Sequence, residues 1–291
     1  MAISSKTSAA PTTSSSSSLA PRQAGAPTWA PAREATIHPG VNTDTAGSCT
    51  SNFIFYQGSD IYIGQAAHCS STGGSTDTNG CTSGSMPEGT KVTITGASAP
   101  GTMVYNSWIR MQARGETDES TCAYNDLALV KLDPADHSKV NPSVPTFGGP
   151  TGLRTEGLAS LDPIFSYGNS ILRQGVTLLS PKYGALIQEQ GDGWSHIVGT
   201  LTPGIPGDSG SGFFDQEGKA FGVLSTLSLA PLPASNGVGD LAKELAYARS
   251  YPEFSNLQLA TGTEPFKVAL PDLQDAVVSA VGALTNPKLP L

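Results

Sequence analysis

Short apolar runs that alternate with clusters of turn-forming residues are the feature that most limits how this chain can fold. From Ile37 to about Ser250 the runs are only a few residues long, and Gly, Pro, Asn and Ser separate them; examples are NFIFY, KVTIT, DLALVKL and AFGVLSTL. Such runs bounded by turn residues are typical of β-strands. The strands do not alternate with helices, as they would in a parallel α/β sheet. The pattern therefore predicts an all-β fold, a sandwich or a pair of barrels, without internal repeats.

The composition excludes several classes of protein. The chain has 291 residues, which is enough for one large domain or two small ones. It contains no apolar run of about 18 residues, so a membrane is not an expected partner. The net charge is −8 and the Lys and Arg residues form no basic stripe, so nucleic acid is not expected either. The low share of charged residues suits a secreted protein.

Three parts of the chain differ in character. Residues 1–36 are predicted to be a disordered tail or propeptide remnant rich in Ser, Thr, Pro and Ala, because such a segment cannot bury enough apolar surface to fold. This tail has no apolar stretch of signal-peptide length, so a secretion signal would already have been removed. Residues 37–250 carry the strand pattern. Residues 251–291 form an extension in which 271–284 show helical spacing of apolar residues, which predicts a C-terminal amphipathic helix packed on the β-structure.

Four cysteines, Cys49, Cys69, Cys81 and Cys122, lie in the first half of the chain. None forms a CxxC pair, which argues against a zinc ribbon or a thioredoxin-like site. An even number in a chain of this type favours two disulfides and an oxidising compartment. The residues alone permit three pairings, and unpaired buried thiols are the alternative.

Three separated segments supply the groups that a nucleophilic serine requires: a base, a carboxylate that orients the base, and donors for an oxyanion. GIPGDSGSGFF places Ser209 in a glycine-rich turn, QAAHC places His68 at the end of an apolar strand, and YNDLALVKL places Asp126 at the head of another. A single histidine or aspartate at such a place is usually structural. All three together, in the order His, Asp, Ser and 58 and then 83 residues apart, are hard to obtain by chance.

The blocks AAHC, NDLALVKL and GDSGSG resemble the three signature blocks of the chymotrypsin-like (trypsin-like) serine proteases, in particular the secreted bacterial type. The resemblance covers about residues 37–250 and keeps the order and approximate spacing of the family. It implies two six-stranded antiparallel β-barrels, here with a C-terminal helix. His68 and Asp126 would come from the first barrel and Ser209 from the second, with the substrate cleft between them.

The resemblance also implies a role for each residue. Ser209 Oγ would attack the scissile carbonyl, His68 would move the proton, and Asp126 would orient the imidazole and stabilise its charged form. The backbone N–H groups of Gly207 and Ser209 match the oxyanion hole of the family. Ser225 matches a serine that borders the substrate strand and supports the aspartate.

Two structural features follow from the same resemblance. It suggests a Cys49–Cys69 disulfide beside the histidine, which leaves Cys81 and Cys122 to form the second one. In many animal members a freed amino terminus pairs with the aspartate before the serine, here Asp208.

This chain has no Ile-Val-Gly-Gly start; its TIHPGV segment resembles the shorter openings of bacterial members, in which an internal arginine meets the aspartate. Arg173 is the predicted partner of Asp208, with a surface arginine as the alternative. Ser211 stands where the family usually has glycine, and we expect the serine to be tolerated.

The substrate pocket is predicted at Pro203 and Gly204 on one side and at Ser225, Thr226 and Leu227 on the other. No aspartate stands at the first position, so a preference for Arg or Lys is disfavoured. Leu227 occupies a place where an open pocket has glycine. It would narrow the pocket and favour small or medium aliphatic side chains.

No cofactor and no required metal are expected. The chain has no phosphate-cradling glycine loop, and its acidic residues near the serine are not spaced as a calcium cage. Three further histidines are predicted to be surface or loop residues: His38, His137 and His196.

The sequence thus predicts a secreted, extracellular serine endopeptidase that acts on polypeptide substrates as a monomer. Two alternatives remain open. One is an esterase or polyester depolymerase with the same triad, and the other is a pseudo-enzyme that only binds proteins.

Overall fold

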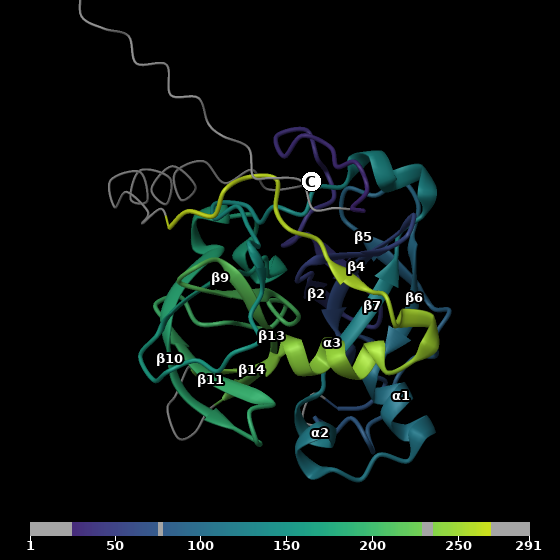
Figure 1. Cartoon of the computed structure of the whole chain (residues 1–291), viewed down its shortest axis with the longest axis vertical. Helices are drawn as coiled ribbons and strands as arrows, with labels where there is room; N and C mark the ends of the chain where they lie inside the picture. Colours follow the sequence, from purple (N-terminus) through teal and green to yellow (C-terminus); the bar gives the residue numbers. More distant parts are fainter. Residues whose placement is uncertain (1–24, 75–77, 229–234, 269–291) are drawn as a thin grey trace, which may run out of the picture.

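A computed structural model gives the fold and describes residues 25–74, 78–228 and 235–268. Two β-structures lie side by side, and helix α3 (Leu241–Arg249) runs from the second toward the first (Figure 1). The helix predicted over 271–284 lies outside the described residues.

The first β-structure is an eight-stranded antiparallel sheet in the order β15-β3-β4-β7-β6-β5-β1-β2. Its strands are β1 (Asn42–Asp44), β2 (Ser48–Thr50), β3 (Ile54–Gln57), β4 (Asp60–Ala66), β5 (Lys91–Ile94), β6 (Gly101–Asn106), β7 (Leu127–Lys131) and β15 (Gln258–Leu259). Among the described residues its edge strands β15 and β2 do not pair with each other. The first predicted barrel is therefore an open sheet of eight strands and not a closed ring of six.

The second β-structure is a closed barrel. Its strands are β8 (Gly152–Leu153), β9 (Pro163–Tyr167), β10 (Pro181–Gln190), β11 (Ser195–Thr200), β12 (Gly212–Asp215), β13 (Lys219–Ser228) and β14 (Ser235–Asp240). The antiparallel order β12-β9-β10-β11-β14-β13 is closed by pairing of β13 with β12, and β8 adds to β13 in parallel. This ring is the predicted six-stranded antiparallel barrel, and the all-β fold class is confirmed.

Short helices connect the strands. They are α1 (Ser107–Arg114), α2 (Glu119–Tyr124), α3 and the 3-10 turns η1 (Ala67–Ser70), η2 (Pro134–Lys139), η3 (Ile171–Arg173), η4 (Thr177–Leu179) and η5 (Pro252–Phe254). Asp240, the last residue of β14, caps α3 by accepting a hydrogen bond from the backbone N–H of Lys243. None of the described helices is long and apolar enough to cross a membrane.

One apolar cluster joins the two β-structures. It contains Phe53 and Leu129 of the first, Phe214 and Val223 of the second, and Leu245 of α3, all buried. The rings of Phe53 and Phe214 meet edge to face with centroids 5.4 Å apart. Because this core is shared, the groups on the facing edges of the two β-structures are held in a fixed relation.

The packed structure extends beyond the limits predicted from the sequence. The predicted tail covers 1–36, but part of it packs on the first β-structure: Ala26 is buried, and the rings of Trp29 and Tyr56 meet edge to face with centroids 6.2 Å apart. At the other end, β15 of the predicted extension 251–291 pairs with β3. Composition misses these segments because their burial depends on contacts with distant strands.

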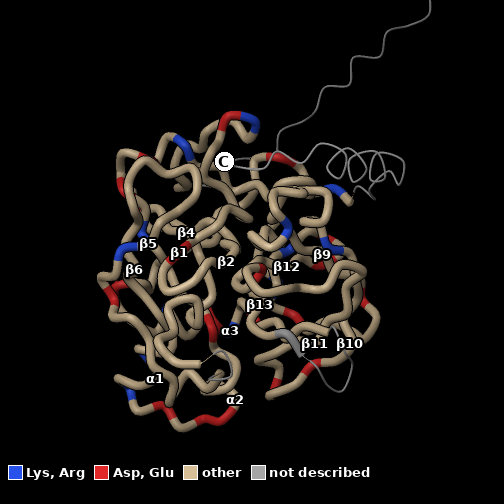
Figure 2. The backbone as a smooth tube through the Cα atoms, turned by 180° about the vertical axis from the view of Figure 1, so that it is seen from behind, with Lys and Arg blue, Asp and Glu red and all other residues tan. Residues whose placement is uncertain are grey.

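The two disulfides are Cys49–Cys69 and Cys81–Cys122, so the predicted pairing is confirmed. The first links β2 to η1, and the second links the loop after η1 to α2. Figure 2 shows Lys and Arg scattered among Asp and Glu over both β-structures in the described part of the chain.

Candidate active site

Strand pairing brings His68 and Asp126 together. Strands β4 and β7 are antiparallel, with Ala66 opposite Leu127, so the residues just beyond these two positions meet at one end of the pair. His68 Nδ1 lies 2.6 Å from Asp126 Oδ2, and the backbone N–H of His68 donates to Oδ1 at 2.8 Å. The carboxylate therefore fixes both the backbone and the ring of the histidine.

Asp126 is buried and is held from the second β-structure as well. The pairing register of β13 shifts between Leu224 and Thr226, and the Oγ of the intervening Ser225 donates to Asp126 Oδ2 at 2.5 Å. The backbone N–H of Asp126 donates to Glu244 Oε1 of α3 at 3.0 Å. Burial raises the pKa of Glu244 well above its ordinary value; the hydrogen bond from the Asp126 backbone N–H opposes this shift, and the charge of Asp126 adds to it.

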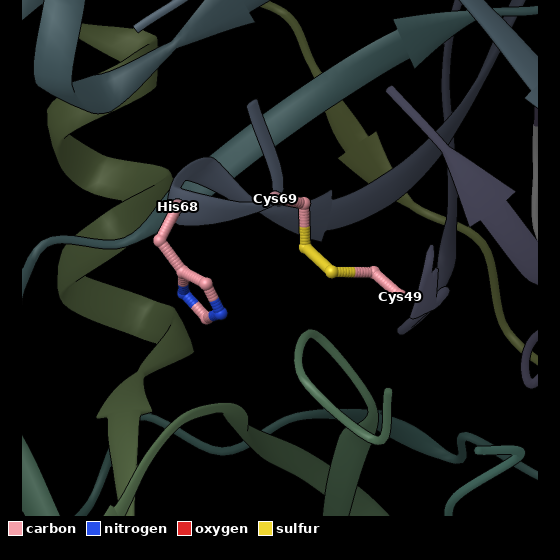
Figure 3. Close-up of side chains that lie close together, drawn as sticks. All are labelled: Cys49, His68 and Cys69. Atoms are coloured by element: carbon pink, nitrogen blue, oxygen red, sulfur yellow. A yellow bond between two sulfur atoms is a disulfide. The ribbon is translucent and has the colours of Figure 1, made fainter. Parts of the chain in front are cut away.

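The electrostatics of His68 follow from this partner. Burial lowers the pKa of His68, but the charge and hydrogen bond of Asp126 outweigh it, so the pKa is raised above its ordinary value. The side chain is 25% exposed. Figure 3 shows its ring beside the Cys49–Cys69 disulfide. Because both sulfur atoms are used in that bond, this cluster is not a metal site.

Ser209 lies in a turn between β11 and β12 that is tied to the first β-structure. Thr50 of β2 donates through its backbone N–H to Ser209 O at 2.9 Å and through its hydroxyl to Gly207 O at 2.8 Å. Gly207 has φ +94°, and a Cβ there would lie 3.0 Å from Ser170 Oγ. The turn therefore requires glycine at this position.

Ser209, His68 and Asp126 line one cleft of about 570 Å³. The backbone N–H groups of Gly207 and Ser209 have no acceptor among residues 25–74, 78–228 and 235–268, so both donors are available to a bound anion. In the same ranges no hydrogen bond joins Ser209 Oγ to His68 Nε2. Such contacts often tighten only when substrate binds.

Asp208, next to the serine, is completely buried and surrounded by donors. Arg173 of η3 binds both carboxylate oxygens, which confirms the predicted pairing. The backbone N–H groups of Ser170 and Ile205 donate at 3.0 and 3.1 Å, and Lys182 Nζ lies 2.9 Å away. Burial raises the pKa of Asp208, but the hydrogen bond from Arg173 and the charges of Lys182 and Arg173 hold it below its ordinary value. Lys182 was not foreseen from the sequence.

Replacing Arg173 with alanine is expected to lower kcat by up to about 100-fold, the scale of losing one oxyanion donor. The Asp208 carboxylate would lose two of its bonds, and the Gly207–Ser209 turn would shift. Arg33→Ala is the matched control, because the Arg33 side chain is 83% exposed and, among the described residues, pairs with Glu34 alone. Steady-state kinetics with a peptide substrate check this; equal effects of the two changes would contradict it.

The predicted pocket residues do not all face the cleft. Gly204, Ser225 and Thr226 line it, whereas Pro203 is not among its described lining residues and directs its carbonyl to Lys182 Nζ at 3.3 Å. Asn236 of β14 also lines the cleft. Its Oδ1 accepts from the Gly204 backbone N–H at 2.8 Å, and its Nδ2 donates to Thr226 O at 3.3 Å.

Sequence reasoning missed Asn236 because an SNG tripeptide is more typical of a turn than of a pocket wall. Leu227 lies in strand β13. That its side chain narrows the pocket remains a prediction. One histidine prediction is wrong: His196 is buried, and its Nε2 lies 3.0 Å from Asp240 Oδ2. The ring packs against Phe221, with centroids 5.3 Å apart, so β11 directs it inward.

Comparisons with known proteins returned structures only. No family model and no curated protein matches the chain. Thermobifida fusca protease A is 18% identical, with a TM-score of 0.49 over 78% of this chain and 100% of that one. A protease described as glutamic acid specific is 18% identical, with a TM-score of 0.47 over 73% and 97%. Cellulomonas bogoriensis chymotrypsin is 15% identical, with a TM-score of 0.46 over 77% and 97%.

The strand order of the chain itself defines the fold. An open antiparallel sheet and a closed six-stranded barrel share one core, and each contributes side chains to the cleft between them. The chain has a chymotrypsin-like fold.

Proposed function

We propose that this protein is a serine endopeptidase that cleaves polypeptides through an acyl-enzyme. One observation carries the proposal: a histidine oriented by a buried aspartate lines the same cleft as a serine whose turn offers two backbone N–H groups that have no acceptor in the described part of the chain. A base, its orienting carboxylate, a nucleophile and an oxyanion site are the parts of a serine acyl-transfer enzyme.

In the first step, Ser209 Oγ bonds to the scissile carbonyl carbon while His68 Nε2 takes the hydroxyl proton. The carbonyl oxygen becomes an oxyanion, which the N–H groups of Gly207 and Ser209 stabilise. The C–N bond then breaks as His68 gives the proton to the leaving amine. Water repeats the sequence on the acyl-enzyme and releases the carboxylic acid, so that Ser209 regains its proton.

Asp126 keeps the base in the correct form during these steps. Its Oδ2 accepts from His68 Nδ1, so the proton of the neutral ring lies on Nδ1 and the lone pair on Nε2 is left for the serine. The charge of Asp126 then stabilises the imidazolium. The Ser225 hydroxyl donates a second hydrogen bond to Oδ2, which limits rotation of the carboxylate.

The cleft favours uncharged side chains at the primary specificity position. Among its described lining residues the only carboxylate is Asp126, which His68 and Ser225 already engage. A cationic Arg or Lys side chain would therefore find no counter-ion. We propose small or medium aliphatic side chains as the preferred group, with Leu227 as the limiting residue.

The proposal includes an extracellular location and action as a monomer, without nucleic acid, membrane or cofactor. Two disulfides support the location, because disulfides persist in oxidising compartments.

The test combines active-site labelling with substrate profiling of the purified protein. A fluorophosphonate should label wild-type protein at Ser209 and fail to label Ser209→Ala. A peptide library should show cleavage after uncharged residues. Labelling with hydrolysis of esters but not of peptides would indicate an esterase, and absence of labelling would contradict a serine enzyme of either kind.

A further inference from the structure

Lys182 is a cation without access to solvent. Its side chain, on β10, is 0% exposed. Its Nζ lies 2.9 Å from Asp208 Oδ2 and donates to the carbonyl oxygens of Thr202 and Pro203 at 3.2 and 3.3 Å. An ammonium has three N–H donors, so these three acceptors satisfy it fully.

Asp208 already has a cationic partner besides Lys182. Arg173 already binds both oxygens of the carboxylate, and two backbone N–H groups add to them. Burial lowers the pKa of Lys182, the charge and hydrogen bond of Asp208 oppose the shift, and the charge of Arg173 adds to it. The net lowering means that the folded protein disfavours the charged form. Because Arg173 already neutralises Asp208, the position of Lys182 indicates a role beyond charge compensation.

The contacts of the ammonium indicate that role. Asp208 belongs to the turn that presents the Gly207 and Ser209 donors, whereas Thr202 and Pro203 lead directly into Gly204, a wall of the cleft. The backbone links these two parts only through the 204–207 loop. The Lys182 ammonium contacts both Asp208 of the turn and the Thr202 and Pro203 carbonyls before the cleft wall, so it joins the two parts directly across the inside of that loop.

We propose that Lys182 is a positioning residue that clamps the oxyanion turn to the pocket wall, so that a side chain bound in the pocket is held in register with the oxyanion donors. The inference rests on the proposed function. It adds that lysine at this position supports catalysis by holding these two parts of the site together.

The main test is Lys182→Met, which keeps the chain length and removes the charge. We expect kcat on a peptide substrate to fall between about tenfold and the 100-fold scale of a lost oxyanion donor, and fluorophosphonate labelling of Ser209 to slow in parallel. The thermal unfolding midpoint at neutral pH should change little, because Asp208 keeps Arg173 as its cation when Lys182 is replaced. Lys131→Met is the control: this strand lysine is 38% exposed and pairs with Asp60.

A second readout uses the unmodified protein and does not depend on the variant folding. The groups that face Lys182 are Asp208 and Arg173, and Tyr167 on the neighbouring strand carries a pKa raised by burial. Since the pKa of Lys182 is lowered from 10.5, neutralising it should reduce kcat/KM before that pH is reached. This decline should be absent in Lys182→Met.

The outcomes separate the inference from the proposed function. Wild-type protein that neither reacts with fluorophosphonate nor cleaves peptides would overturn the proposed function. If the wild-type protein is active and folded Lys182→Met has an unchanged kcat, whatever its unfolding midpoint, the clamp alone would be overturned. If the variant does not fold, a wild-type kcat/KM that stays level up to pH 10.5 would overturn it.

Discussion

Replacing Ser209 with alanine should lower kcat by about a million-fold, the scale seen when the nucleophile of such a triad is removed. The fold should be unaffected, because Ser209 Oγ makes no hydrogen bond within the described residues, and the contact of Ser209 O with the Thr50 backbone N–H remains. Rates of peptide cleavage and the unfolding midpoint, measured on the same preparations, check both parts.

A variant with both Ser209 and His68 replaced tests whether the two residues act together. Because serine and histidine act as one unit, His68→Ala should cost about as much as Ser209→Ala, and the pair together should cost little more. Ser138→Ala, an exposed serine that does not line the cleft, is the matched control and should be fully active. A Ser209→Ala protein with a tenth of wild-type turnover would show that another residue is the nucleophile.

The features that sequence predicted correctly are of two kinds: those encoded locally, and those implied by a family resemblance. Short runs between turn residues indicate strands wherever they occur, and the two disulfides and the Arg173–Asp208 pair followed from positions in a resembling family. The open form of the first sheet was not predictable in this way. Its closure depends on whether β15 and β2, more than two hundred residues apart, meet.

The residues that sequence missed act through partners far along the chain. Glu244 accepts from the Asp126 backbone across 118 residues, and Asn236 holds Gly204 across 32. Neither lies in a motif, since an isolated glutamate in a helix and an asparagine before glycine are ordinary. Their importance arises only when α3 packs against the first β-structure and β14 takes its place in the second barrel, so it is a property of tertiary structure.

Replacing Asp126 with asparagine should lower kcat by about 10⁴-fold, the scale seen when the aspartate of a Ser-His-Asp triad is changed to asparagine. In this structure Asp126 accepts from His68 Nδ1, the His68 backbone N–H and Ser225 Oγ, so every contact requires an acceptor. An asparagine amide must direct its NH₂ group at one of these donors. If it meets His68, the ring is held with its proton on Nε2, which can no longer accept the serine proton.

The pH profile distinguishes this loss from a general disturbance of the site. Asp126 raises the pKa of His68, so its neutralisation should lower that pKa and move the acid limb of kcat/KM to lower pH. Ser225→Ala leaves the charge of Asp126 in place and serves as the matched control: kcat should fall far less, and the acid limb should stay near its wild-type position. An Asp126→Asn protein whose acid limb does not move would show that Asp126 is not the partner that sets the basicity of His68, and the proposed triad would fail with it.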